Sequence, residues 1–166
     1  MRVILLNLPW SKNSRFGVRA GSRWPFTAEP EKDGYIHYIP FPFFLAYAAA
    51  LLKKEGYDIK LIDAIAEGID ERETIEKTLA YNPGLIVIET STPSFSSDMR
   101  IILNISVSLP VSHIALCGPH ATVFSEQILS KYDFVDYILR GEYEYVLSDL
   151  VNHLDKLQQM SQGNFS

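Results

Sequence analysis

The sequence predicts an α/β fold, a doubly wound sheet of five parallel strands in the order 2-1-3-4-5 with helices on both faces. Two observations carry this prediction: short, nearly continuous apolar runs recur along the chain, and segments with helical patterns separate them. Apolar runs without alternation are typical of strands that are covered on both faces. Right-handed crossovers between such parallel strands favour the doubly wound order.

The strands are expected where the apolar runs lie: VILLNL (3–8), IKLID (59–63), LIVIE (85–89), HIALCG (113–118) and VDYILRG (135–141). The helices are expected in the segments that follow them, at 43–55, 70–81, 96–108, 123–131 and 143–157. Local signals support several of these ends: Gly56 ends the first helix, Asp70 caps the second, and Pro83 follows it. Ser97 or Asp98 is expected to cap the third helix.

Composition indicates one cytoplasmic globular domain. A chain of 166 residues with 47% hydrophobic content can bury a core of its own. Its net charge of -5 argues against a nucleic-acid partner or a basic membrane-binding face. The start of the chain lacks the pattern of a signal peptide, and the apolar stretch 41–52 is too short to span a membrane.

The single cysteine, Cys117, sets a further limit on the chemistry. It cannot form an intrachain disulfide, and it excludes a zinc or iron–sulfur site built from several cysteines of this chain. Because Cys117 lies in an apolar strand, it is expected to pack in the core. Tyr143 and Tyr145 are expected to pack the last helix against the sheet.

The first connection, residues 9–42, is much longer than the usual link between a strand and a helix. It mixes Arg15, Arg19 and Arg23 with aromatic residues, which a disordered linker would contain less often. We therefore expect a functional loop within a domain that spans residues 1–155. Residues 156–166 are expected to be a polar tail or linker.

The candidate binding residues share one kind of position, since each lies at the end of a predicted strand or shortly after it. In doubly wound sheets the ligand lies beyond the carboxyl ends of the strands. Gly and Pro at such exits let the backbone approach a ligand and stiffen the turn. The candidates are Asn7, Pro9, Trp10, Thr90, Ser91, Thr92, Pro93, Ser94, Gly118, Pro119, His120, Thr122, Gly141 and Glu142.

Several ligand classes are disfavoured by the same exits. The sequence after the first strand lacks the dinucleotide fingerprint G-x-G-x-x-G, and no P-loop occurs in the chain. Thr90 and its neighbours stand where a phosphorelay receiver would carry an aspartate. A flavin- or nucleotide-binding protein, a small hydrolase that uses Ser91 or Ser94 with His120, and a module that only contacts proteins remain as alternatives. The hydrolase lacks a G-x-S-x-G elbow.

A set of motifs in order along the chain resembles a known family. The motifs are RAGSRWP, FPFFLAYAAALLKKEGY, LIDAIAEG, LIVIETSTPSF, ALCGPHATVF and VDYILRGEYEY. They resemble the amino-terminal cobalamin-binding domain of cobalamin-dependent radical S-adenosylmethionine (SAM) enzymes, and the likeness extends from residue 1 to about residue 154. The resemblance implies a flavodoxin-like (Rossmann-like) fold and cobalamin, a cobalt corrinoid, as the ligand.

The resemblance also implies a partner. Members of the family carry a downstream radical SAM domain in which a CxxxCxxC motif holds a [4Fe-4S] cluster, and this chain has only Cys117. We therefore expect no iron–sulfur cluster in this chain and no turnover by it alone. The radical SAM domain is expected in cis or in trans, with methyl transfer as one reaction of the full system. The DxHxxG motif that places a histidine on cobalt in methionine-synthase-like domains is absent.

Individual roles follow from the resemblance. It assigns Ser91, Thr92 and Pro93 to one wall of the pocket for the nucleotide tail, and Gly118, Pro119 and His120 to the other. Gly141 and Glu142 are expected to close the rim, and the long first loop to cover the corrin ring. A bulky residue at position 91 or 92 is therefore expected to abolish corrinoid binding with little effect on stability.

Overall fold

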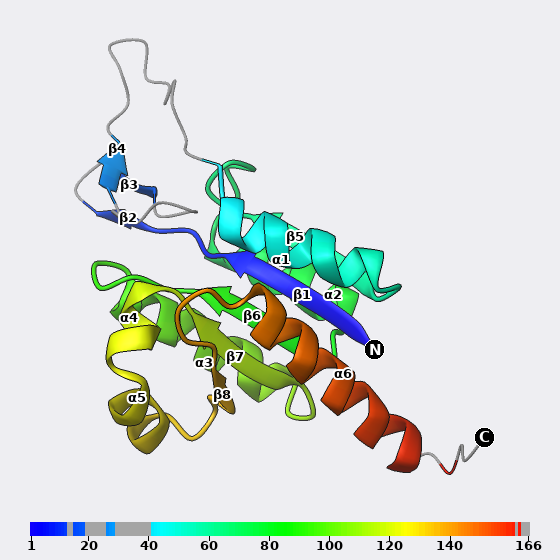
Figure 1. The fold of residues 1–166 in the computed structure, drawn as a ribbon. Coiled ribbons are helices and arrows are strands. Elements are labelled where there is room, and N and C mark those ends of the chain that lie inside the picture. The colour runs from blue at the N-terminus through cyan, green and yellow to red at the C-terminus, as the bar shows by residue number, and fades with distance from the viewer. Residues whose placement is uncertain (13–14, 19–25, 29–40, 162, 164–166) are drawn as a thin grey trace.

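A computed structural model describes residues 1–12, 15–18, 26–28, 41–161 and 163, with side chains for residues 1–10, 41–161 and 163. Five strands form the main sheet: β1 (Arg2–Asn7), β5 (Asp58–Asp63), β6 (Leu85–Glu89), β7 (His113–Cys117) and β8 (Tyr137–Ile138). Their order is β5-β1-β6-β7-β8, and every pair is parallel. The predicted 2-1-3-4-5 order is confirmed (Figure 1).

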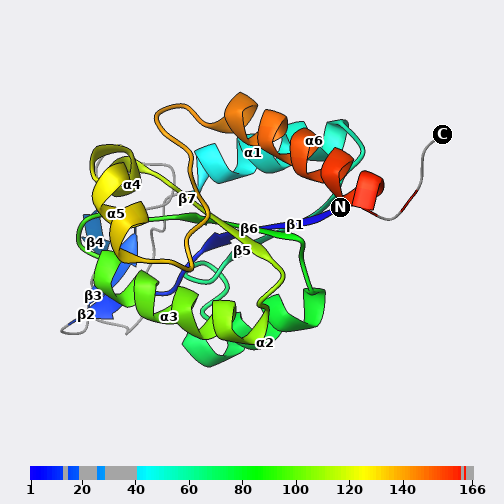
Figure 2. The same ribbon diagram turned by 90° about the horizontal axis from the view of Figure 1, so that it is seen from below.

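Helices cover both faces of this sheet. Figure 2 shows α1 (Phe43–Lys54) and α6 (Glu144–Ser161) on one side, and α2 (Glu71–Tyr81) and α3 (Phe95–Ser108) on the other. Two short helices, α4 (Pro119–Val123) and α5 (Ser125–Lys131), follow β7. No helix in the part of the chain that the structure describes is both long enough and apolar enough to cross a membrane.

Alternate side chains of the central strands enter two separate cores. Ile4, Leu6, Ile86 and Ile88 pack in the cluster that contains residues of α3 and α5. Their neighbours in the strands pack with residues of α1 and α6. Because both faces are covered, the strands carry apolar residues at almost every position, which is the pattern that predicted them.

Some element boundaries differ from the expected ones. The expected helix at 123–131 is wrong at its start, because a helix already begins at Pro119, where the missing N–H of proline carries no cost. Phe124, at φ -108° and ψ 27°, separates α4 from α5. The last strand pairs only over Tyr137–Ile138, and the last helix runs to Ser161.

The long first connection contains a second sheet, which the sequence did not predict. β2 (Ser11–Lys12), β3 (Arg15–Val18) and β4 (Phe26–Ala28) pair antiparallel in the order β2-β3-β4. This sheet lies beyond the carboxyl end of β1 (Figure 1). The expected contribution of Arg15, Arg19 and Arg23 to a lid falls outside the described side chains.

The helix caps show which local signals were correct. Asp70 caps α2 as predicted, since its Oδ1 accepts the Glu73 N–H at 2.8 Å. Gly56 follows α1 in a left-handed conformation with φ 93°. The prediction for α3 is wrong: the helix begins at Phe95, so Ser97 and Asp98 lie inside its first turn.

Replacing Asp70 with alanine tests the cap. We expect Asp70→Ala to lower the free energy of unfolding by about 1 kcal/mol, because the Glu73 N–H loses its acceptor. Chemical denaturation followed by circular dichroism measures the change. Asp133→Ala, at an exposed aspartate outside the helices, is the matched control. Equal stability of the two variants would contradict the capping role.

Candidate functional site

The structure brings the predicted residues after β6, β7 and β8 to one edge of the sheet. The Thr90 N–H donates to the Cys117 carbonyl at 3.0 Å, so the exits of β6 and β7 stay side by side. Thr92 Oγ1 lies 3.1 Å from His120 Nδ1, and the Gly141 N–H donates to Thr122 Oγ1 at 3.1 Å. Three consecutive strand exits are therefore connected by hydrogen bonds. Among the other candidates, Pro119 and Glu142 are exposed at the same edge.

Gly118 is required at the point where two exits approach most closely. Its φ is 95°, a backbone angle that residues with a side chain rarely adopt. An added Cβ would also lie 2.5 Å from the Thr90 carbonyl oxygen. The glycine therefore serves the packing of β7 against β6. It lets the backbone of the β7–α4 turn reach the residues that follow β6.

The hydroxyl-rich segment after β6 is organised by a buried carboxylate. Thr90 Oγ1 and Ser94 Oγ each donate to Oδ2 of Asp98 at 2.7 Å, and Asp98 is fully buried in the first turn of α3. Ser91 Oγ lies 3.0 Å from Ser94 Oγ, and the Ser91 N–H points to the same oxygen at 3.4 Å. Hydrogen bonds to a charged acceptor are stronger than neutral ones, so this network fixes the turn.

This arrangement corrects one expectation about the hydroxyls. Ser91 and Ser94 are only 4% and 2% exposed, so a bulky residue at position 91 would disturb the turn itself. The expectation that position 91 can be enlarged without loss of stability is wrong, because Ser91 belongs to the buried network. Thr92 and Pro93 are the exposed members of the segment. They are the residues of this turn whose side chains reach the surface.

His120 lies half-buried between two aromatic rings. Its ring centroid is 4.1 Å from that of Phe95 and 4.6 Å from that of Phe124. Burial lowers the pKa of His120 below its ordinary value, and the negative charge of Asp98 opposes part of that shift. The neutral imidazole is therefore favoured, and its hydrogen bond with Thr92 orients the ring.

Asn7 ends the central strand in a buried pair with Asp63 of β5. The two residues face each other in the strand register, and Asn7 Nδ2 donates to Asp63 Oδ1 at 2.8 Å. Asn7 is 1% exposed, and its Oδ1 has no hydrogen-bond partner. A buried acceptor without a donor costs roughly 1–3 kcal/mol. Pro9 and Trp10 follow as half-buried residues.

Cys117 and Tyr143 occupy the core beneath this edge. Burial raises the pKa of the Cys117 thiol well above its ordinary value, and the carboxylate of Glu89 adds to the shift. Burial likewise raises the pKa of Tyr143. Cys117 therefore stays a protonated core residue, as expected from its place in the strand. Tyr143 is also buried as expected. The expectation that Tyr145 packs the last helix is wrong, because its side chain is exposed.

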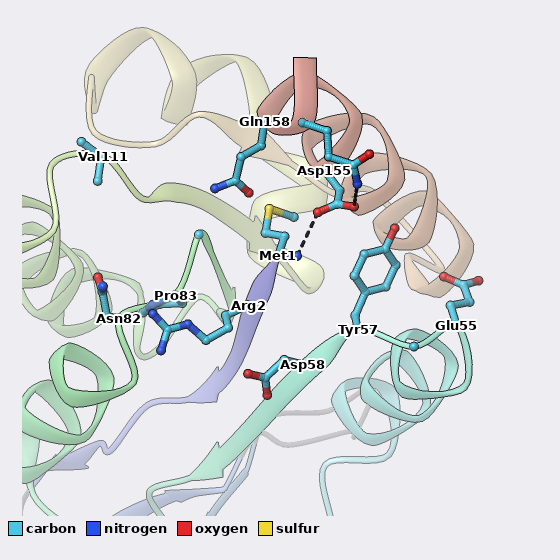
Figure 3. Close-up of a pocket in the computed structure, with 13 residues that line it drawn as sticks. Met1, Arg2, Glu55, Tyr57, Asp58, Asn82, Pro83, Val111, Asp155 and Gln158 are labelled. Carbon is cyan, nitrogen blue, oxygen red and sulfur yellow. Dashed lines mark hydrogen bonds and ion pairs between the residues drawn. The ribbon is translucent and has the colours of Figure 1, made fainter. Parts of the chain in front are cut away.

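An open cleft lies at the opposite edge of the sheet. Figure 3 shows the residues that line this cleft at the amino ends of the strands. Its volume is about 910 Å³. The amino group of Met1 pairs with Asp155 at 2.8 Å there, and Arg2, Tyr57 and Asp58 line the same cleft. None of the candidate binding residues lines it. Over the described residues, no group of three or more His, Cys, Asp or Glu side chains could hold a metal ion.

A family comparison decides how this edge is interpreted. The model of the B12 binding domain matches residues 34–151, which is most of the chain. The chain belongs to the B12-binding domain family. The matched region of this B12-binding domain includes the exits of β6, β7 and β8, and the resemblance drawn from the sequence motifs is confirmed. The family supports cobalamin binding by this domain.

Curated relatives of the B12-binding domain are larger enzymes. The chain is 30% identical over 124 residues to the anaerobic magnesium-protoporphyrin IX monomethyl ester cyclase of Rubrivivax gelatinosus, covering 74% of this chain and 22% of that protein. The cyclase of the same name from Synechocystis is 28% identical over 157 residues, covering 93% of this chain and 28% of the relative. An uncharacterized methyltransferase of Pyrococcus horikoshii is 28% identical over 120 residues, covering 72% and 26%.

This domain thus spans only about a quarter of the length of the curated relatives it matches. No solved structure matches the chain significantly. The residues that sequence reasoning missed are Asp98 and Asp63. Asp63 is the last residue of a predicted strand and carried a usable signal. Asp98 resembled a helix cap, and only the fold shows that it accepts hydrogen bonds from residues before the helix.

Changing Asp98 to asparagine tests the network. The asparagine side chain presents an N–H₂ group and lacks the charge, so the hydroxyls of Thr90 and Ser94 lose their strong acceptor. We expect Asp98→Asn to lower the free energy of unfolding by about 1–3 kcal/mol in denaturant titrations. Ser96→Ala, at an exposed position of the same helix, should change it far less. An unchanged stability of Asp98→Asn would show that the network contributes little.

The lowered pKa of His120 predicts a pH dependence of stability. The folded state disfavours the charged imidazole, so the unfolded chain binds the proton at a higher pH than the folded protein does. The contribution of His120 to the free energy of unfolding therefore declines as the pH falls through about 6.5. We expect the stability difference between the unmodified protein and His120→Gln to shrink between about pH 7.5 and about pH 5.5. Thermal unfolding across this range measures it. A difference that stays constant or grows would contradict the assigned pKa direction.

Proposed function

We propose that this B12-binding domain holds cobalamin against the carboxyl edge of its sheet and presents it to a radical SAM domain, in cis or in trans. The observation that carries the proposal is the overlap of two independent findings. The family match covers residues 34–151, and the connected strand exits after β6, β7 and β8 lie within it. The same edge is where doubly wound sheets bind their ligands.

The chemistry of the described residues fits a cobalamin molecule, which combines a flat corrin ring rimmed by amides with a nucleotide tail. The exposed Thr92 and the half-buried His120 offer polar atoms beside the rings of Phe95 and Phe124. Small buried residues at positions 91, 94 and 118 let the turns after β6 and β7 pack closely beneath Thr92 and His120. Asn7 supplies a buried oxygen that still lacks a donor.

We assign the ligand contacts accordingly. Thr92 and Pro93 form one wall for the nucleotide tail, and Pro119, His120 and Thr122 form the other. Thr90, Ser91, Ser94 and Gly118 hold these walls in place, while Gly141 and Glu142 form the rim. Asn7, Pro9 and Trp10 approach the ligand from the central strand.

The wider system follows from the same proposal. When bound, cobalamin supplies a cobalt centre that can carry a methyl group, so methyl transfer is a suitable reaction for the full system. A relative is named as a methyltransferase, and others are named as cyclases. We propose that the protein is cytoplasmic. The binding domain would comprise residues 1–155, and residues 156–166 would form a tail or linker. The radical SAM domain would supply the catalytic step, so this chain alone is expected to show no turnover.

The described geometry does not favour a serine hydrolase. His120 Nδ1 lies beside Thr92, whereas Ser94 donates to Asp98 and Ser91 bonds to Ser94. A nucleophilic serine requires a base within hydrogen-bond reach, and the side chains of both serines form their hydrogen bonds within the 90–98 network. The arrangement therefore supports a binding surface more than a catalytic one.

A titration of the protein with hydroxocobalamin tests the proposed function. We expect saturable binding, followed by the corrin visible spectrum and by equilibrium dialysis. Thr92→Leu should weaken it by about tenfold or more, because the exposed side chain would fill the space of the ligand without disturbing the core. Ser96→Leu, at an exposed position on α3, is the matched control and should bind normally. Absence of binding by well-folded protein would refute the proposal.

A further inference from the structure

We infer that the Asn7–Asp63 pair distinguishes an amide from a carboxylate on the corrin rim. It selects a corrinoid with an amide at the rim position that lies against the carboxyl end of β1, and it rejects one with a carboxylate there. This inference rests on the proposed function and adds to it a specificity and a positioning residue. It begins from one atom, the buried Oδ1 of Asn7, which has no hydrogen-bond partner. Native proteins seldom bury such an acceptor without a reason, so a missing donor is indicated.

The orientation of the Asn7 amide follows from its neighbour. An ionised Asp63 can accept hydrogen bonds but cannot donate one. Its Oδ1 accepts from Asn7 Nδ2 at 2.8 Å and from the Ala66 N–H at 3.2 Å. The nitrogen of Asn7 must therefore face Asp63, which leaves Oδ1 on the other side. The backbone holds the residue as well, since the Ala64 N–H donates to the Asn7 carbonyl at 3.0 Å. The amide cannot flip without losing its bond to Asp63.

The neighbours of Asn7 in the same face of β1 are Val3 and Leu5, which have no polar side-chain groups. The buried hydroxyl of Tyr143 belongs to the same core and also has no hydrogen-bond partner, but it lies beside Cys117 of β7. A donor to Asn7 Oδ1 that comes from the ligand edge therefore fits the arrangement.

On β6, Leu6 pairs with Ile88, so the next residue, Glu89, lies beside Asn7. On β5, Asp63 already accepts a hydrogen bond from Asn7 through its Oδ1. Both side chains are acids, so an approaching anion would meet two acidic neighbours.

A primary amide satisfies these conditions and a carboxylate does not. An amide N–H can donate to the fixed Oδ1 of Asn7, while an ionised carboxylate can only accept and adds a negative charge beside Asp63 and Glu89. The rim of cobalamin carries primary amides, and corrinoids in which one amide is hydrolysed carry a carboxylate at the same place. The pair thus distinguishes two ligands of nearly equal size and shape. Asp63 acts as a positioning residue, because it determines which atom of Asn7 faces the ligand.

The test compares hydroxocobalamin with its b-, d- and e-monocarboxylic acids by equilibrium dialysis at neutral pH. For the unmodified protein we expect one of the three acids to bind about tenfold or more weakly than hydroxocobalamin, because it loses a hydrogen bond and places a charge against Asp63. The other two acids should bind nearly as well as hydroxocobalamin. In Asp63→Asn the Asn7 amide is free to flip. The gap, meaning the ratio of the affinity for hydroxocobalamin to that for the sensitive acid, should then fall to about threefold or less.

Two controls separate the outcomes. Asp133→Asn removes the same charge at an exposed site and should leave the gap unchanged, and thermal unfolding verifies that each variant is folded. Equal binding of hydroxocobalamin and all three acids by the unmodified protein would overturn the inference and leave the proposed function standing. Uniform weakening of all three acids that persists in Asp63→Asn would also overturn it. Failure to bind hydroxocobalamin at all would remove both the inference and the proposed function.

Discussion

The parallel register of β5, β1, β6 and β7 determines where polar groups can lie in this fold. Both faces of the sheet are covered by helices, so the central strands β1 and β6 are apolar up to their last residue, apart from Arg2 at the start of β1. Because all strands point the same way, those last residues meet at one edge. Asp63 faces Asn7, and Glu89 faces Cys117, in the two outer pairs of this row. The chemistry of the domain is therefore concentrated at one edge by the direction of its strands.

At this edge the side chains have two distinct tasks. Thr90, Ser91 and Ser94 are buried and bonded within the network of Asp98, so they give the turn its shape. The exposed Thr92 and the half-buried His120 lie in the same pair of turns and bond to each other. A rigid buried layer thus supports a smaller outer layer. Such support explains how loop residues can hold a fixed geometry for a large ligand.

The sequence predicted the main sheet well because continuous apolar runs such as LIVIE are distinctive when both faces are buried. It also predicted the Asp70 cap, which depends on residues three apart. It failed where an interaction spans two elements. Asp98 resembled a cap but accepts bonds from Thr90, and the pairing of Asn7 with Asp63 joins residues far apart in sequence. The small sheet β2-β3-β4 was missed because strands of two to four residues leave little pattern.

The two edges of the sheet differ, and the proposed function places the ligand at the carboxyl ends of the strands. Hydrogen–deuterium exchange of the protein with and without saturating hydroxocobalamin tests it most directly. We expect slower exchange at residues 7–10, 90–95 and 118–122, with no change around the cleft of Figure 3 at residues 55–58 and 82–84. Protection at that cleft, with the residues after β6 and β7 unchanged, would contradict it.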